Sequence, residues 1–193
     1  MKQHYRSSWY ILFSLLVVGF SPAIQAQNSV SLLYVKNELN EEDWNPIHDQ
    51  KGWGIVSEIG LANQPFSIVT SYYTTSASNS VPLGNITIDF SADTDELAIG
   101  LRRNINLADV NLFIEGGLTS IHTQIHFSNS LNGGGSLTDT GYWLGAGMGI
   151  KLSRHISAGI LARRPNVSTT SNGISMKLGG DQTLLFISYH LGD

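Results

Sequence analysis

The sequence predicts an all-β fold, an eight-stranded antiparallel up-and-down transmembrane β-barrel preceded by a cleaved signal peptide. Three observations lead to this fold. Apolar and polar residues alternate with a period of two along most of the chain. The connections between the alternating segments are long and short in turn. One face of these segments is aliphatic, whereas the other is rich in glycine and poor in lysine.

The first part of the chain has the three regions of a secretory signal peptide. A short basic start precedes an apolar run over residues 9–20, which is too short to cross a bilayer as a helix. Ala26 then supplies the small residue that signal peptidase requires. We therefore expect residues 1–26 to be removed and residues 27–193 to form one outer-membrane β-barrel domain.

The composition excludes several kinds of site. The chain has no cysteine, which excludes disulfide frameworks, zinc–thiolate sites and thiol nucleophiles. A formal net charge of −4 without a basic cluster argues against nucleic acid as a partner. The acidic segment 38–49 could in principle hold a divalent cation, but its spacing matches no calcium loop. We interpret it as a solvated loop and expect neither a metal nor a cofactor.

Eight segments carry the period-two pattern of strands. They lie near residues 29–37, 53–62, 66–75, 86–103, 110–127, 140–152, 156–164 and 182–191. The long, polar connections are 38–52, 76–85, 128–139 and 165–181, and the short ones are 63–65, 104–109 and 153–155. An even number of strands, with tight turns at one end and long loops at the other, is typical of an outer-membrane barrel.

The two faces of the strands indicate which side meets lipid. Along residues 142–152, Leu144 and Ile150 belong to an aliphatic face, and Trp143 alternates with glycines on the other. We expect the aliphatic face to contact lipid and the mixed face to fill the lumen, because eight strands leave room only for side chains. The alternative is a soluble periplasmic lipocalin-like carrier, in which these two faces would be reversed.

Charged residues in the middle of strands are predicted to form a network inside the lumen. The members of this network are Glu58, Glu96, Glu115, Arg102 and Arg163. A lone charge in a dry interior is costly, so these side chains need one another as partners. Together with Trp143 and Phe113 they should close the lumen. Aromatic residues at strand ends should form the interfacial girdles, namely Trp53, Phe66, Tyr72, Tyr142 and Tyr189.

The glycine-rich hairpin that runs from Gly141 through a tight turn to Gly159 resembles the penultimate hairpin of the small OmpX/OmpA-type outer-membrane barrels of Gram-negative bacteria. The resemblance covers residues 27–193 and implies a monomer in the outer membrane. It also implies insertion by the barrel assembly machinery and contact with outer-membrane lipid and lipopolysaccharide. The implied role is structural or a surface interaction through the long extracellular loops. These barrels commonly end on an aromatic residue, whereas here the alternation ends at Leu191.

Some small barrels of this kind are lipid A deacylases, in which a His-x-Ser pair and an acid cleave an ester. His126 and Ser128 form such a pair at the outer end of a strand, and Asp139 follows across the next loop. Those enzymes carry their pair in the last hairpin, which has no such motif here. A lipid hydrolase that uses these three residues is therefore the enzymatic alternative to a barrel without catalytic residues.

Overall fold

The computed structural model describes residues 28–39, 41–62, 64–84, 86–128, 133–171 and 174–191. The predicted signal peptide lies outside the described residues. Within them, no helix is long and apolar enough to cross a membrane.

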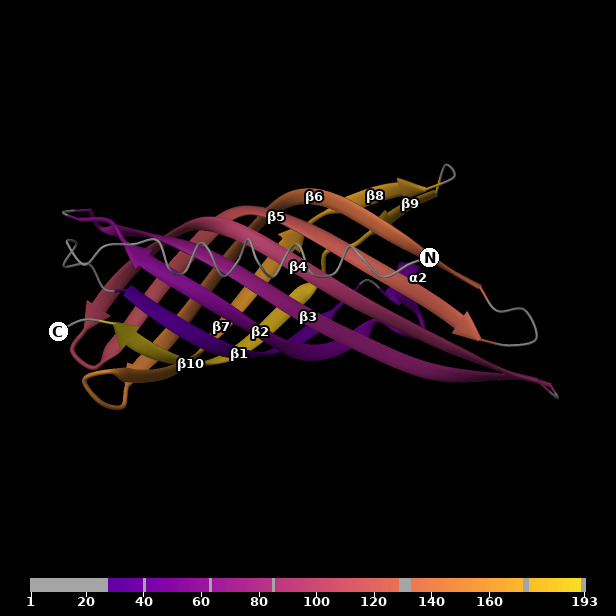
Figure 1. The fold of residues 1–193 in the computed structure, drawn as a ribbon, viewed down its shortest axis with the longest axis horizontal. Helices are drawn as coiled ribbons and strands as arrows, with labels where there is room; N and C mark the ends of the chain where they lie inside the picture. The colour runs from indigo at the N-terminus through magenta and orange to yellow at the C-terminus, as the bar shows by residue number, and fades with distance from the viewer. Residues whose placement is uncertain are drawn as a thin grey trace, which may run out of the picture.

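Eight antiparallel strands close into a barrel (Figure 1). They are β1 (Asn28–Glu38), β2 (Asp49–Gly60), β3 (Phe66–Leu83), β4 (Ile86–Leu107), β5 (Val110–Ser128), β6 (Gly133–Lys151), β7 (Ile156–Asn166) and β10 (Asp181–Leu191). Neighbours in the chain pair with one another, and β1 pairs with β10 to close the ring. The predicted up-and-down barrel and all eight predicted strands are confirmed.

The two ends of the barrel differ in length and in their connections. At one end, on the left in Figure 1, lie the short connections between consecutive strands, which include residues 108–109 and 152–155, and β10 ends there too. At the other end β3, β4, β5 and β6 extend far past the remaining strands. These four strands have 18, 22, 19 and 19 residues, compared with 11 or 12 in β1, β2, β7 and β10. We call the turn-bearing end the inner end and the other the outer end.

The predictions of two long loops, at residues 76–85 and 128–139, are wrong. Residues 76–83 belong to β3 and residues 133–139 belong to β6, where they pair with β4 and β5. The backbone ladder needs no apolar face, so segments of serine, threonine and glycine can continue a strand beyond the lipid. Gly84 takes a φ of 64° in the turn between β3 and β4, a left-handed conformation that glycine adopts without steric cost. We call the outer parts of these strands, residues 77–83, 86–95, 120–128 and 133–141, the protruding sheet.

The other two long connections contain short elements of their own. Residues 41–44 form the helix α2 (Glu41–Trp44), which follows β1. Between β7 and β10, β8 (Ser168–Ser171) and β9 (Ile174–Lys177) pair in a separate two-stranded sheet. Both elements lie at the outer end of the barrel (Figure 1).

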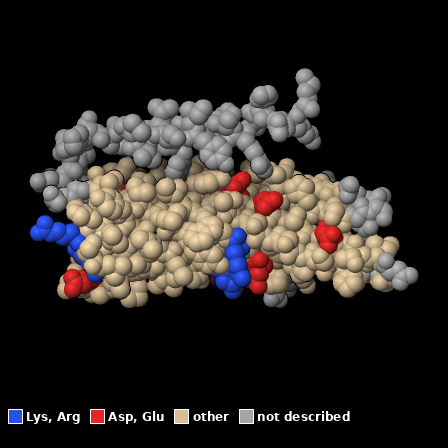
Figure 2. Space-filling view, turned by 60° about the horizontal axis from the view of Figure 1, so that its bottom comes forward, with Lys and Arg blue, Asp and Glu red and all other residues tan. Residues whose placement is uncertain are grey.

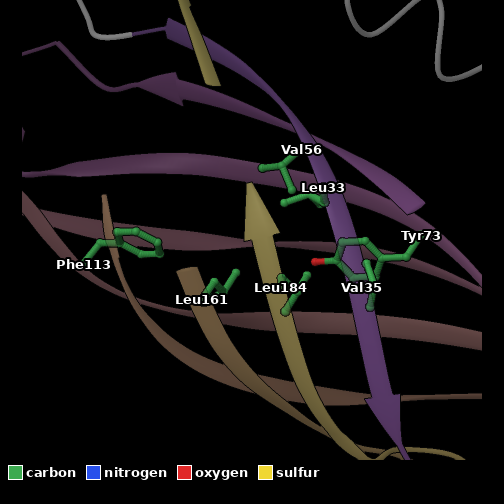
Figure 3. Close-up of a cluster of buried hydrophobic side chains, with 7 residues drawn as sticks. All are labelled: Leu33, Val35, Val56, Tyr73, Phe113, Leu161 and Leu184. Atoms are coloured by element: carbon green, nitrogen blue, oxygen red, sulfur yellow. The ribbon is translucent and has the colours of Figure 1, made fainter. Parts of the chain in front are cut away.

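The lumen is filled by side chains. A buried apolar cluster consists of Leu33, Val35, Val56, Tyr73, Phe113, Leu161 and Leu184. Figure 3 shows these residues projecting from different strands into the interior. Glycine makes room for the rings, since a Cβ built on Gly147 would lie 2.3 Å from Cζ of Phe113. The glycines on the mixed face are thus required by close packing inside a narrow barrel.

The aliphatic face lies on the outside. Exposed apolar side chains include Leu97, Ile99, Leu101, Leu112, Ile114, Leu118, Leu144, Met148, Ile150, Leu185, Ile187 and Leu191. On the face seen in Figure 2, a broad band without Lys, Arg, Asp or Glu separates the charged residues at the inner end from those nearer the outer end. The predicted assignment of the two faces is confirmed. It is the reverse of the arrangement expected for a lipocalin-like carrier, because Glu58, Glu115 and Arg102 are buried inside.

Candidate functional site: the lumen and the outer surface

The inner half of the lumen holds an arginine between two glutamates. Arg102 on β4 and Glu115 on β5 are direct cross-strand partners. The guanidinium Nε of Arg102 donates to Oε2 of Glu115 at 2.7 Å, and its Nη1 donates to Oε2 of Glu58 at 2.7 Å. The carbon at its centre lies 4.1 Å from the centroid of the Phe113 ring. Each of the three charged side chains is at most 10% exposed, so all of them depend on this pairing.

Neutral side chains complete the partners of Glu58. Its second oxygen, Oε1, accepts hydrogen bonds from Oγ of Ser67 at 2.5 Å and from Nδ2 of Asn104 at 2.6 Å. Asn111 in turn donates to Oδ1 of Asn104 at 3.0 Å. One guanidinium cannot neutralise two carboxylates. The negative charge of Glu58 is therefore also stabilised by the dipoles of Ser67 and Asn104.

A second ion pair closes the outer half of the lumen. Arg163 on β7 donates through Nη2 to Glu96 on β4 and through Nη1 to the hydroxyl of Tyr73. Its guanidinium carbon lies 3.9 Å from the ring centroid of Trp143, a cation–π contact. The other oxygen of Glu96, Oε2, accepts a hydrogen bond from Nε2 of Gln182 at 2.7 Å. The partners come from four different strands, so this network ties the barrel wall together across its interior.

The structure places all five predicted lumen residues inside the barrel and pairs every arginine among them with glutamate. The pairing divides them into two separate networks rather than one. The cavity beside Arg102 measures about 30 Å³, which is room for about two water molecules. Within the described residues the lumen is thus a packed interior.

An apolar cap covers the outer end of the lumen. Its buried residues are Leu39, Trp44, Ile47, Ala92, Ile121, Val167 and Leu178. Nε1 of Trp44 donates to the backbone oxygen of Lys177 at 2.6 Å, and the backbone N–H of Lys177 donates to Oδ2 of Asp43 at 3.1 Å. We call residues 39, 41–48, 167–171 and 174–178 the outer cap, which packs on Ala92 of β4 and Ile121 of β5. The sequence pattern did not predict this cap, although Trp44 and Ile47 are unusual residues for a solvated acidic loop.

The three residues of the enzymatic alternative lie apart in the structure. His126 and Ser128 are both exposed on the outer surface of β5, and no hydrogen bond joins them. His126 pairs with Gly134 across the sheet, and Asp139 lies five residues further along β6, or about 17 Å away. Asp139 also has the same parity as Trp143, whose side chain faces the lumen. The structure therefore does not bring His126, Ser128 and Asp139 together, because the acid is on the opposite face of the sheet from the other two.

The predicted aromatic residues lie at two levels of the exterior. Phe66 and Tyr189 are at the inner end, where Tyr189 stacks on His155 with ring centroids 5.9 Å apart. Trp53, Tyr72 and Tyr142 are toward the outer end, and each of the five is at least partly exposed. Two aromatic levels that flank an aliphatic band are the pattern of interfacial girdles.

Comparison with known proteins places this architecture among outer-membrane barrels. No protein-family model and no curated protein matches the sequence. Among solved structures, Ail of Yersinia pestis in complex with the heparin analogue sucrose octasulfate is similar, with a TM-score of 0.61 and 15% identity over 87% of this chain and 100% of that one. The outer membrane protein OprG from Pseudomonas aeruginosa gives a TM-score of 0.59 and 7% identity over 88% and 98%.

The N-terminal β-barrel domain of Pseudomonas aeruginosa OprF gives a TM-score of 0.51 and 14% identity over 86% of this chain and 100% of that one. Structural similarity at sequence identities this low shows a shared fold alone. The chain therefore has the fold of the small outer-membrane β-barrels, as its resemblance to the OmpX/OmpA-type barrels predicts.

Proposed function

We propose that this protein is a non-conducting barrel of the cell outer membrane that holds the protruding sheet at the cell surface for interaction with other molecules. The observation that carries the proposal is the contrast between the two ends. The lumen is blocked by two ion-pair networks and the outer cap, while four strands continue beyond the lipid-facing band. A barrel with no open path has little use as a pore, whereas a rigid, elevated sheet is suited to binding.

The edges of the protruding sheet support an interaction role. Residue 76 is the last residue of β3 that pairs with β2, so residues 77–83 pair only with β4 among the described strands. In the same way, residues 133–141 of β6 pair only with β5. Strand edges with unpaired N–H and C=O groups are templates for the addition of another strand. An extended segment of a partner protein is therefore a suitable ligand.

The charge of the protruding sheet restricts the class of partner. The sequence contains no Lys or Arg in residues 67–101 or 104–150, which include the whole sheet. Its outer strands instead carry Asp89, Asp93, Asp95 and Asp139. The similar structure of Ail contains a heparin analogue, which is a polyanion. For the present chain we expect a neutral or cationic partner, because a sulfated polyanion would be repelled.

Other partners belong to the same proposal. The chain acts as a monomer, contacts outer-membrane lipid and lipopolysaccharide along its aliphatic exterior, and is inserted by the barrel assembly machinery. The alternating residues of β10 up to Leu191 supply the C-terminal strand that this machinery reads.

Site-directed labelling tests both the location and the orientation. Because the protein has no cysteine, Ser80→Cys in the protruding sheet and Ser153→Cys at the inner end each introduce a single thiol. A membrane-impermeant maleimide added to intact cells should label the first and not the second. Purified protein in planar bilayers should show no steady conductance. Labelling of Ser153→Cys alone would show that the orientation is the opposite of the one proposed. Equal labelling of both variants, together with recovery of the protein in the soluble fraction, would refute the membrane location.

A further inference from the structure

The outward side chains of β1 and β2 form a ladder that is ordered by polarity. The direct cross-strand pairs, from the middle of the barrel toward its outer end, are Leu32 with Ile55, Tyr34 with Trp53, Lys36 with Lys51, and Glu38 with Asp49. The ladder therefore passes from aliphatic to aromatic, then to cationic and finally to anionic side chains. Each step is about 7 Å, since alternate residues of a strand share a face.

The aromatic step marks the boundary of the lipid-facing band. The rings of Tyr34 and Trp53 meet edge to face with centroids 5.3 Å apart. Trp53 is 60% exposed although it is large and apolar. Leu32, one step toward the middle, is 61% exposed as expected for a residue in contact with acyl chains. Aromatic residues concentrate at the level of the lipid headgroups, so this pair indicates where the acyl region ends.

The cationic step lies immediately outside the aromatic one and is electrostatically unfavourable by itself. Lys36 and Lys51 are direct partners across the strands, and like charges in this position destabilise a sheet. Lys36 forms an ion pair with Glu38, but its ammonium group has three donors and retains two. Lys51 has no ion pair with any described residue. An anion placed between the two ammonium groups would remove the repulsion.

Few other cations lie at this level of the barrel. The strands β3 to β6 contribute none, since residues 67–101 and 104–150 lack Lys and Arg. Arg164 on β7 already contacts Asp181, with its Nε 3.2 Å from Oδ1 of the carboxylate. The paired lysines are therefore the place at the outer lipid boundary where two cations lie side by side, with the carboxylates of Glu38 and Asp49 one step further out.

We propose that Lys36 and Lys51 together bind a phosphate group of a phosphorylated glycolipid of the outer leaflet, while Tyr34 and Trp53 pack against its sugar and the start of its acyl chains. The proposal rests on the outer-membrane location proposed above. A phosphate monoester carries a charge of about −1.5 to −2 and three acceptor oxygens, which matches two opposed ammonium donors. Its depth in the leaflet matches as well, because headgroup phosphates lie directly outside the acyl region.

Native mass spectrometry of the full mature protein, refolded in a zwitterionic detergent, tests the site. The probes are bis-phosphorylated lipid A, lipid A from which the phosphates have been removed, and inorganic phosphate. The test variant is Lys36→Gln with Lys51→Gln. The control variant, Arg164→Gln with Lys177→Gln, removes the same charge from elsewhere at the outer end. Heat-modifiable gel mobility shows that each variant is folded.

We expect the unmodified protein to bind the bis-phosphorylated lipid about tenfold more tightly than the dephosphorylated one. The test variant should lose this preference and the control variant should keep it. Lys36→Arg with Lys51→Arg should restore it, since the positive charge is retained. A preference that survives in the test variant would overturn the proposal. Binding of inorganic phosphate with the same affinity would overturn the glycolipid as its source. Both results are independent of the labelling that tests the membrane location.

Discussion

Arg102 and Glu115 face each other across β4 and β5 and are joined inside the lumen, with Nη2 and Nε of the arginine 2.6 Å and 2.7 Å from the same carboxylate oxygen. Glu58 approaches the guanidinium from a third strand. This cluster therefore contains one cation and two anions, and we expect its three members to contribute unequally to the stability of the barrel.

Removal of the arginine should cost more than removal of either acid. Arg102→Met leaves two buried carboxylates without a cation, which should destabilise the barrel by about 3–5 kcal/mol. Glu115→Gln leaves a neutral Arg102–Glu58 pair and should cost clearly less. Urea unfolding in detergent micelles, followed on gels, measures both. Arg103→Met is the control, because the neighbouring Arg103 points outward. Equal losses for Arg102→Met and Glu115→Gln would contradict the described pairing.

An arginine on the lipid-facing side should be costly. Leu144 and Ile187 are 65% and 62% exposed, and both belong to the aliphatic band. Leu144→Arg and Ile187→Arg should each destabilise the protein by about 2–4 kcal/mol when it is folded into vesicles, since a charge near the middle of the bilayer is poorly solvated. The same measurement on Ser80→Arg, outside the lipid, should show little change. Equal changes in stability for all three substitutions would show that Leu144 and Ile187 do not contact lipid.

Gly147 should not tolerate a side chain. A Cβ at this position would lie 2.3 Å from the Phe113 ring and 2.7 Å from the backbone oxygen of Ile160, so Gly147→Ala should cost about 1–3 kcal/mol. Gly135→Ala is the matched control, since a Cβ there meets nothing within 4 Å. A double-mutant cycle with Phe113→Leu should show positive coupling because the smaller side chain relieves the clash. Additive effects would rule out the contact.

The outer cap should open without loss of the barrel. Trp44→Ala removes a fully buried ring and its hydrogen bond to Lys177, so the outer cap should become sensitive to protease and its amides should exchange faster. Heat-modifiable mobility should remain, and planar bilayers should stay silent because Arg163 and Glu96 close the lumen below the cap. Steady conductance from this variant would place the main seal in the cap. Trp44→Phe, which retains most of the ring packing, should give a smaller effect.

Lipid A should be unchanged by this protein. Since Asp139 is separated from His126 and Ser128 by the sheet, these residues have no orienting acid from the predicted set. Mass spectrometry of lipid A from cells with the protein, without it, and with Ser128→Ala should give the same spectrum. An acyl chain that is lost only with the unmodified protein would restore the hydrolase interpretation.

The barrel was predictable from the sequence because burial in a strand alternates with period two. Residues two apart in a strand share a face wherever the strand begins or ends. The lumen side therefore contains both Val56 and Glu58, and likewise both Phe113 and Glu115. The same rule put Arg102 on the inside but could not select its partners. That choice depends on the register between β4 and β5, which sequence alternation leaves free by steps of two residues.

The outer end was less predictable, for two physical reasons. Residues 76–83 and 133–139 consist mostly of serine, glycine and other small or polar residues without a regular apolar alternation, yet their backbones pair fully with the neighbouring strands. The contact between Trp44 and Lys177 joins residues that are 133 positions apart. No local pattern encodes such a contact, and the segment around Trp44 therefore resembled a solvated loop.

The bond between Trp44 and Lys177 also constrains the order in which the protein can assemble. Hairpins such as β4–β5 join near neighbours in the chain and can form early, whereas the ring closes only when β1 meets β10. The two halves of the outer cap flank β1 and β10, so the tryptophan reaches its acceptor only once the ring is nearly closed. Burial of Trp44 is thus a late event, and its fluorescence should report a finished molecule rather than a partly inserted one.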